Sequence, residues 1–251
     1  MFYDNDYLLS DSGYPASVIE KDGEIILSNG IAERKFRFVP DFCCISLQNL
    51  YSGEQFLRSI KPEISLTVDG VYYPVGGVDG QFERAFLKEE WYQNFTRHNG
   101  FHYISHRITK IERDFCWEDH RSHNKRSFPP RGVRLDVDFA CEALKGVLVT
   151  VHYEMYDGLP AVGKSFTLVN HSGKEILLNE FEAEILALTE HDSNRESTAS
   201  KLTQAEHNIF FSSSIENQYT PTFGFHLDPE YTSQVDYNCL SLCQLISKPK
   251  I

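Results

Sequence analysis

The chain has 251 residues, of which 41% are hydrophobic and 13% aromatic, so it is long enough to bury a sizeable core. Its formal net charge of −12 argues against binding to nucleic acid or to anionic membrane surfaces. No apolar stretch approaches the roughly 20 residues that a membrane helix needs, and no signal peptide is visible. The sequence is compatible with a cytoplasmic protein and with an exported protein whose signal peptide has been removed.

The first third of the chain consists of short apolar runs that turn signals separate. One run lies at 17–20, and several more lie within 23–78. The clearest turn is Asp69-Gly70, which lies between the β-branched and aromatic runs 64–68 and 71–75. Because glycine tolerates the positive φ of a tight primed turn, this pair predicts a two-residue hairpin that joins the two runs.

Beyond this region the pattern changes once and then returns to short strands. Residues 82–95 have apolar residues near helical spacing, which predicts a short helix or an ordered loop. Polar segments at 115–131 and 190–206 predict loops. The remaining runs predict strands, at 101–111, 134–139, 147–154, 162–170, 176–188, 207–216, 222–228 and 233–247. This spacing, without helix–strand alternation, predicts one all-β sandwich or barrel domain over the whole chain.

Six pieces of the sequence carry a family resemblance through their order and spacing. They are 27–31 followed by Arg34, 57–58 followed by 61–63, 69–70 followed by 75–77, 128–135, 153–160 followed by Lys164 and Asn170, and 179–187 with Glu184. Together they resemble the N-terminal β-supersandwich of alpha-galactosidases of glycoside hydrolase family 36 and their relatives. The chain departs from that pattern at Phe128 and Arg131, where such domains have Trp and Lys.

The resemblance implies a galactose-mutarotase-like supersandwich fold for residues 1–251, which would form the N-terminal part of a longer glycoside hydrolase. In that family the two catalytic Asp residues lie on a (β/α)8 barrel after this domain. The resemblance therefore implies no catalytic residue and no cofactor in this chain.

The role that the resemblance implies is structural. The domain would pack on the downstream barrel of the same polypeptide, shape its pocket for galactosides, and support contacts in a homo-oligomer. Two alternatives stay open. One is a free-standing carbohydrate-binding module, and the other is a mutarotase-type aldose epimerase.

The polar segment 115–131 is the first candidate for contact with a sugar or with the barrel. An aromatic ring can act as a platform for a sugar, a carboxylate can hold its hydroxyl groups, and long loops on a rigid sandwich often carry function. The candidate residues are Trp117, Glu118, Asp119, His120 and Arg121, with Trp91 as a second aromatic platform. The ordinary alternatives are a solvated loop for the segment and a core position for Trp91.

Histidines offer two further patterns. A mutarotase needs a His acid and a Glu base that face the sugar, and His152 and Glu154 share one strand face with His171 near in sequence. The ordinary alternative is the polar outer face of a sandwich. His98, His102 and His106 have the spacing of helical metal ligands, but a glycine among them breaks a helix, so we expect no metal site there.

A surface metal site from His120 and His123 with Glu118 and Asp119 is a further possibility, against a solvated polar loop. The six cysteines lack zinc-site spacing, and buried free thiols are their expected state.

Overall fold

The computed structural model describes residues 14–81, 87–112, 128–188, 225–227 and 240–242. Within these ranges the chain is mostly antiparallel β-strand, and its one helix is the 3-10 helix η1 (Glu89–Asn94). The all-β sandwich that the sequence predicts is therefore confirmed. No helix in the described ranges is long and apolar enough to cross a membrane.

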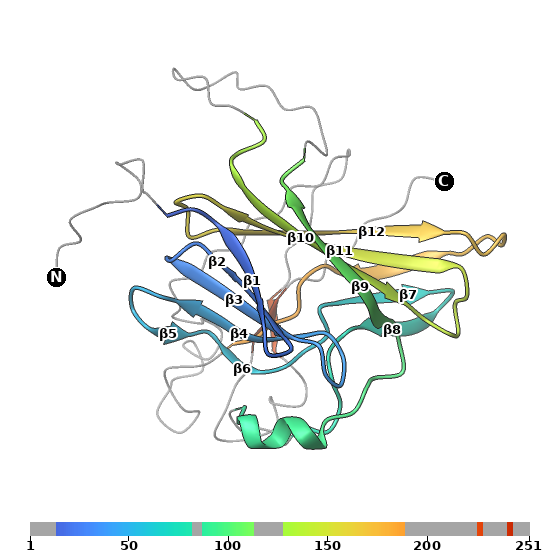
Figure 1. The fold of residues 1–251 in the computed structure, drawn as a ribbon. Coiled ribbons are helices and arrows are strands. Elements are labelled where there is room, and N and C mark those ends of the chain that lie inside the picture. The colour runs from blue at the N-terminus through green and yellow to red at the C-terminus, as the bar shows by residue number, and fades with distance from the viewer. Residues whose placement is uncertain (1–13, 82–86, 113–127, 189–224, 228–239, 243–251) are drawn as a thin grey trace.

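Three sheets build most of the molecule (Figure 1). The N-terminal sheet runs in sequence order through β1 (Ser17–Lys21), β2 (Glu24–Ser28), β3 (Ala32–Arg37), β4 (Cys43–Asn49) and β5 (Glu54–Gln55). The long sheet has the order β12-β11-β10-β9, with β9 (His102–Lys110), β10 (Gly132–Ala140), β11 (Val147–Tyr156) and β12 (Val162–Asn170). The hairpin sheet has the order β13-β7-β8, with β13 (Leu178–Glu182), β7 (Ile64–Val68) and β8 (Val71–Val75).

Two smaller pairs complete the described strands. β14 (Ala187–Leu188) pairs with β6 (Leu57–Ser59), and β15 (Phe225–Leu227) pairs with β16 (Leu240–Leu242). The predicted strands 222–228 and 233–247 each contain one of these last two strands. The predicted strand 207–216 and the predicted loop 190–206 lie outside the described residues.

One hydrophobic core joins the three sheets into a sandwich. On β11, Val147, Val149, Val151 and Tyr153 share one face of the strand and are at most 3% exposed. They belong to the same core cluster as side chains from the N-terminal and hairpin sheets. The ring of Phe36 lies 4.7 Å from that of Tyr153, between centroids, and so ties β3 to β11 across the two layers. Burial of apolar area on this scale is the main force that holds such layers together.

The predicted hairpin is confirmed. β7 pairs with β8 in the expected register, from Ile64 opposite Val75 to Val68 opposite Val71. Asp69 and Gly70 have φ angles of 50° and 78°. Positive φ at both central residues is the geometry of a type I′ turn, which matches the twist of the flanking strands.

Two predictions need correction or refinement. The predicted single strand 176–188 is two strands, β13 and β14, separated by residues 183–186. The chain leaves the sheet there because Glu184 turns toward buried cations, as described below. The segment 82–95 forms a short 3-10 helix only over η1, and residues 82–86 lie outside the described ones.

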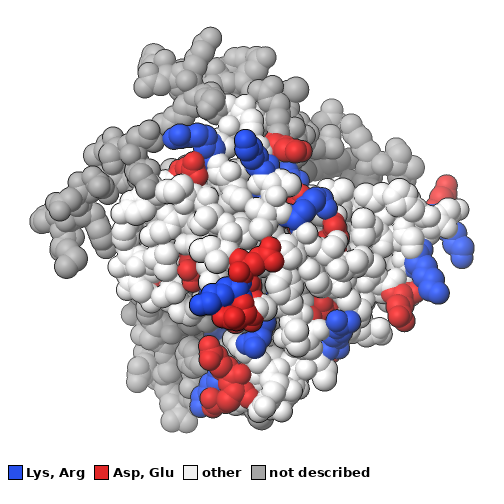
Figure 2. All heavy atoms as spheres, viewed as in Figure 1, with Lys and Arg blue, Asp and Glu red and all other residues white. Residues whose placement is uncertain are grey.

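The charged side chains are mixed in sign on the face drawn in Figure 2. Lysine and arginine lie among aspartate and glutamate across the described part of that face.

Candidate functional site

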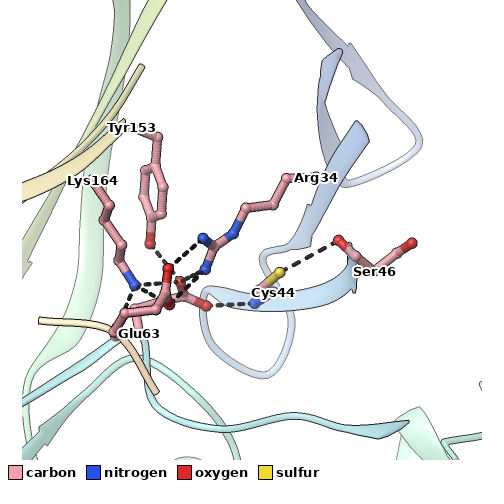
Figure 3. Close-up of polar contacts among 7 residues, drawn as sticks. Arg34, Cys44, Ser46, Glu63, Tyr153 and Lys164 are labelled. Atoms are coloured by element: carbon pink, nitrogen blue, oxygen red, sulfur yellow. Dashed lines mark hydrogen bonds and ion pairs between the residues drawn. The ribbon is translucent and has the colours of Figure 1, made fainter. Parts of the chain in front are cut away.

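A cluster of charged side chains lies inside the sandwich, where the three sheets meet (Figure 3). Arg34 comes from β3, Tyr153 from β11 and Lys164 from β12. Glu63 directly precedes β7, and Glu184 lies between β13 and β14. The side chains of Arg34, Glu63 and Lys164 are 3%, 1% and 6% exposed and that of Glu184 is 16% exposed, so most of this cluster is closed to solvent.

Glu63 is the centre of the cluster. Its Oε2 accepts hydrogen bonds from Tyr153 Oη at 2.5 Å and from Arg34 Nη2 at 3.2 Å. Its Oε1 accepts the backbone N–H of Cys44 at 2.6 Å, and Lys164 Nζ lies 3.6 Å from Oε2. Figure 3 shows these side chains converging on Glu63 from separate strands. A buried carboxylate needs this number of partners to offset the loss of its hydration.

Glu184 is the second carboxylate of the cluster. Its Oε2 and Oε1 accept hydrogen bonds from Arg34 Nη1 at 2.7 Å and Nη2 at 3.1 Å, which is the bidentate geometry that favours arginine. Lys164 Nζ donates to Oε1 of Glu184 at 2.7 Å and to the backbone carbonyl of Glu63. Two cations therefore face two anions, and the formal charge of the cluster is zero.

The electrostatics of the cluster keep the Arg34–Glu184 pair ionised. Burial works to raise the pKa of Glu184, but the charges of Arg34 and Lys164 outweigh it and lower that pKa to about 2. Burial works to lower the pKa of Arg34, but Glu184 and Glu63 raise it well above its ordinary value. Burial first, and then the charge of Glu63, raise the pKa of Tyr153, so its hydroxyl stays a proton donor to that carboxylate.

This arrangement is suited to holding the fold together and not to acid–base catalysis. A glycosidase needs one carboxylic acid that gives up a proton and a second carboxylate across the scissile bond. Glu184 is held ionised far below neutral pH, and Glu63 is 1% exposed with its oxygens occupied. The Glu184 side chain is 16% exposed, but both of its oxygens are bonded to cations. The cluster of Arg34, Glu63, Tyr153, Lys164 and Glu184, hereafter the buried lock, therefore serves to join the layers.

A second polar network lies on the face of the long sheet opposite the core valines of β11. Asp136 on β10 is its centre, with Arg134 Nε at 2.8 Å, His152 Nδ1 at 2.5 Å and Arg107 Nε at 3.1 Å from its carboxylate. Burial works to raise the pKa of Asp136, but the hydrogen bonds from His152 and Arg134 outweigh it and lower that pKa to about 2. His152 lies on the predicted polar face, yet it is only 6% exposed.

The mutarotase-like set is not assembled as a working acid and base. The ring nitrogens of His152 are both occupied, one by Asp136 and the other by Thr167 Oγ1 at 2.8 Å. Glu154 accepts a hydrogen bond from Tyr156 Oη at 2.9 Å. His171 lies six residues along the chain from Ser165, the cross-strand partner of His152, a separation of about 20 Å along a strand.

The sugar or barrel candidates mostly lie outside the described residues. Trp117, Glu118, Asp119, His120 and Arg121 all do, and so does the candidate metal ligand His123. Trp91 is described, on η1. It is half-buried against a small core cluster of Cys43, Ile60, Val78 and Phe95, with Lys88 Nζ 5.5 Å from its ring centroid. The Trp91 ring therefore packs in part on this small core cluster and is in part exposed to solvent.

The three regularly spaced histidines each pair with a different carboxylate. His98 lies 2.7 Å from Asp79, His102 lies 2.7 Å from Asp41, and His106 lies 3.1 Å from Glu20. In the part of the chain that the structure describes, no group of three or more metal-ligating side chains could hold a metal ion.

The described cysteines are the buried free thiols that the sequence predicts, namely Cys43, Cys44 and Cys141. Cys44 lies beside the buried lock, and its burial outweighs the opposing charge of Arg34 and raises its pKa to about 12. A thiol with so high a pKa stays protonated and is a poor nucleophile.

Sequence patterns alone do not identify the buried lock as a site, although its residues carry the resemblance. One signal was available: Arg34 is in phase with the core residue Phe36 on the same strand, and Tyr153 is in phase with three buried valines. A charged residue on the apolar phase of a strand predicts a buried ion pair, but it does not say which anion pairs with it.

Comparisons with known proteins leave the family open. A scan against protein-family models matches no family, and a search of curated proteins finds no match.

Proposed function

We propose that the chain is the non-catalytic N-terminal β-supersandwich domain of an alpha-galactosidase-like glycoside hydrolase. In this proposal it packs on a downstream (β/α)8 barrel and shapes the rim of a pocket for galactosides. The catalytic carboxylates would belong to that barrel.

One observation carries the proposal: residues from separate pieces of the resemblance meet in the buried lock. Four of the six pieces contribute its members, Arg34, Glu63, Tyr153, Lys164 and Glu184. A fifth piece contributes Gly76, where an added Cβ would lie 2.5 Å from the Phe42 carbonyl oxygen and 3.5 Å from Glu63 Cγ. The resemblance therefore follows the parts of the chain that build one internal structure, which is what a structural domain requires.

The chemistry of the described residues supports the non-catalytic part of the proposal. Within the buried lock, the pKa of Glu184 is lowered to about 2 and Glu63 is 1% exposed, and His152 has both ring nitrogens occupied. These observations favour the structural role over the aldose epimerase alternative. The carbohydrate-binding alternative rests on Trp91 and the segment 115–131, and a direct binding measurement separates it from our proposal.

Expression of two proteins tests the proposal, residues 1–251 alone and the complete product of the gene. We expect the complete product to hydrolyse a nitrophenyl alpha-galactoside, and residues 1–251 to show no turnover above a heat-inactivated control. A nitrophenyl beta-galactoside serves as the matched substrate control and should stay intact with both proteins.

Three results would contradict the proposal. The first is a complete product without a barrel or without alpha-galactosidase activity. The second is hydrolysis or mutarotation by residues 1–251 alone. The third is saturable binding of galactose to residues 1–251 in calorimetry, together with a gene that encodes no further domain, which would favour the carbohydrate-binding module.

A further inference from the structure

Three side chains on the polar face of the long sheet form a relay from a carboxylate to an exposed hydroxyl. Asp136 on β10, His152 on β11 and Thr167 on β12 belong to three neighbouring strands of that sheet (Figure 1). His152 Nδ1 lies 2.5 Å from Asp136 Oδ1, and His152 Nε2 lies 2.8 Å from Thr167 Oγ1. A carboxylate, an imidazole and a hydroxyl in this order are the constellation that activates a hydroxyl as a nucleophile.

The register of the sheet brings these three residues together. Asp136 and His152 are direct cross-strand partners, and so are His152 and Ser165. Thr167 is two residues along β12 from Ser165, so it shares a face of the sheet with His152 and is its diagonal neighbour. Diagonal neighbours on one face are within reach of a long or aromatic side chain. The ring of His152 therefore connects Asp136 with Thr167.

The hydrogen bonds determine which atom carries each proton. With a pKa of about 2, Asp136 is ionised at neutral pH and can only accept, so the ring proton of His152 lies on Nδ1. In the neutral ring Nε2 is then an acceptor, and the Thr167 hydroxyl donates to it. Arg134 and Arg107 also contact the Asp136 carboxylate and hold it in place. His152 is thus oriented to take a proton from Thr167.

The hydroxyl end of this relay is the end that solvent reaches. His152 is 6% and Asp136 is 5% exposed, whereas Thr167 is an exposed residue. The contacts that keep a sugar away from His152 therefore leave the Thr167 hydroxyl accessible. Thr150, the cross-strand partner of Thr167, differs in both respects, because its Oγ1 donates directly to Asp138 at 2.7 Å and the residue is 6% exposed.

We propose that Thr167 is an acyl acceptor for small activated esters, with His152 as its base and Asp136 as a positioning residue. Thr167 Oγ1 forms a bond to the acyl carbon and passes its proton to His152 Nε2. The bond from the acyl carbon to the leaving oxygen breaks, and the leaving alcohol takes that proton from His152. The products are an ester on Thr167 and a free alcohol. This inference does not depend on the glycosidase assignment, since no glycosidic bond takes part.

Treatment of the protein with para-nitrophenyl acetate tests the acceptor, with the acetyl group located by mass spectrometry of peptide fragments. We expect an acetyl ester on Thr167 in the unchanged chain. Thr167→Val keeps the shape of the side chain without its hydroxyl and should lose this label, and Thr167→Ser should regain it. Ser165→Ala is the matched control, because Ser165 is also exposed on β12 and lies opposite His152. It should acetylate at Thr167 like the unchanged chain.

The base and the positioning residue have separate tests. His152→Gln should slow the acetylation of Thr167 by about a hundredfold, which is at the low end for loss of a general base. In the nitrogen-15 spectrum of the histidine rings, the signals that disappear in His152→Gln should show the ring proton on Nδ1. In Asp136→Asn the new amide can donate to Nδ1, so the ring proton should move to Nε2 and acetylation should slow as well.

Three results would overturn the proposal. The first is acetylation of lysines or of Ser165 with none on Thr167, and the second is an equal rate at Thr167 in a folded His152→Gln variant. The third is a His152 ring proton on Nε2 in the unchanged chain. Thr167→Val and Thr167→Ser alter an exposed position, so they still test the acceptor if the variants at His152 and Asp136 do not fold.

Discussion

At the scale of single residues, the buried lock holds four formal charges, those of Arg34, Lys164, Glu63 and Glu184, and their sum is zero. Arg34 also uses its aromatic neighbours, since its guanidinium carbon lies 5.1 Å from the ring centroid of Tyr153 and 5.4 Å from that of Phe36. Its Nε is buried without a hydrogen-bond partner, a cost that the bidentate pair with Glu184 offsets. Such a cluster specifies one arrangement of the strands, because any other leaves a buried charge without a counter-charge.

The lowered pKa of Glu184 predicts a loss of stability in acid. Its folded-state value of about 2 lies below the ordinary value of 4.5, so its contribution is complete above pH 4.5 and is lost as the pH falls toward 2. The contribution is on the order of 3 kcal/mol. In urea unfolding at several pH values, the free energy of unfolding should therefore fall less between pH 4.5 and 2 for Glu184→Gln than for the unchanged chain.

Glu180→Gln is the control for this measurement, because Glu180 on the neighbouring strand is exposed. Its pH dependence should match that of the unchanged chain. The free energy of unfolding of Glu184→Gln should still fall somewhat in acid, because Asp136 also has a lowered pKa of about 2. Identical acid dependence in Glu184→Gln and the unchanged chain would show that Glu184 is not held ionised as described.

At the scale of elements, the turn at Gly70 depends on backbone conformation alone. A Cβ at Gly70 would meet no atom within 4 Å, but its φ of 78° strains any β-branched residue. We expect Gly70→Val to lower the free energy of unfolding by about 1 kcal/mol or more. Gly70→Asn should cost less, since asparagine tolerates this conformation. Equal melting temperatures for both variants and the unchanged chain would contradict the turn assignment.

The segment 115–131 stays a prediction at this scale. We expect Trp117 to face a barrel or a sugar, so Trp117→Ala should cost less than about 3 kcal/mol of stability in the isolated chain. In the complete glycosidase that we propose, the same change should reduce activity or assembly. Phe139→Ala supplies the comparison, because Phe139 is fully buried and its loss should cost about 3–5 kcal/mol. A similar cost for Trp117 would identify it as a core ring.

Elements that depend on local sequence were predictable, and those that depend on distant partners were not. The Asp69-Gly70 hairpin and the alternating strand β11 follow from neighbouring residues, and both are confirmed. The break between β13 and β14 does not follow from local alternation, since Glu184 leaves the strand to reach cations on β3 and β12. A contact between residues 150 positions apart in the chain has no signal in a local pattern.

At the scale of the whole molecule, local sequence patterns also failed to show which distant residues form a site. The aromatic and charged residues that the sequence favoured lie mostly outside the described ranges, while the buried lock was present only as scattered members of a resemblance. Composition and strand rhythm predicted an all-β sandwich because layers of strands need one shared core. They could not predict that two cations and two carboxylates would lie inside it, since pairing of that kind is set by the packing of all three sheets.

The free energy of unfolding of Glu63 variants tests the central claim, that the buried lock joins the layers of the sandwich. Removal of one partner from a buried ion-pair cluster costs about 3–5 kcal/mol, so Glu63→Gln should lose roughly this amount in urea unfolding. Tyr153→Phe, which removes only one hydroxyl, should lose about 1–2 kcal/mol and still fold. Glu180→Gln should stay within about 0.5 kcal/mol of the unchanged chain. If Glu63→Gln and Tyr153→Phe both keep the unfolding free energy of the unchanged chain, the buried lock does not hold the layers of the sandwich together.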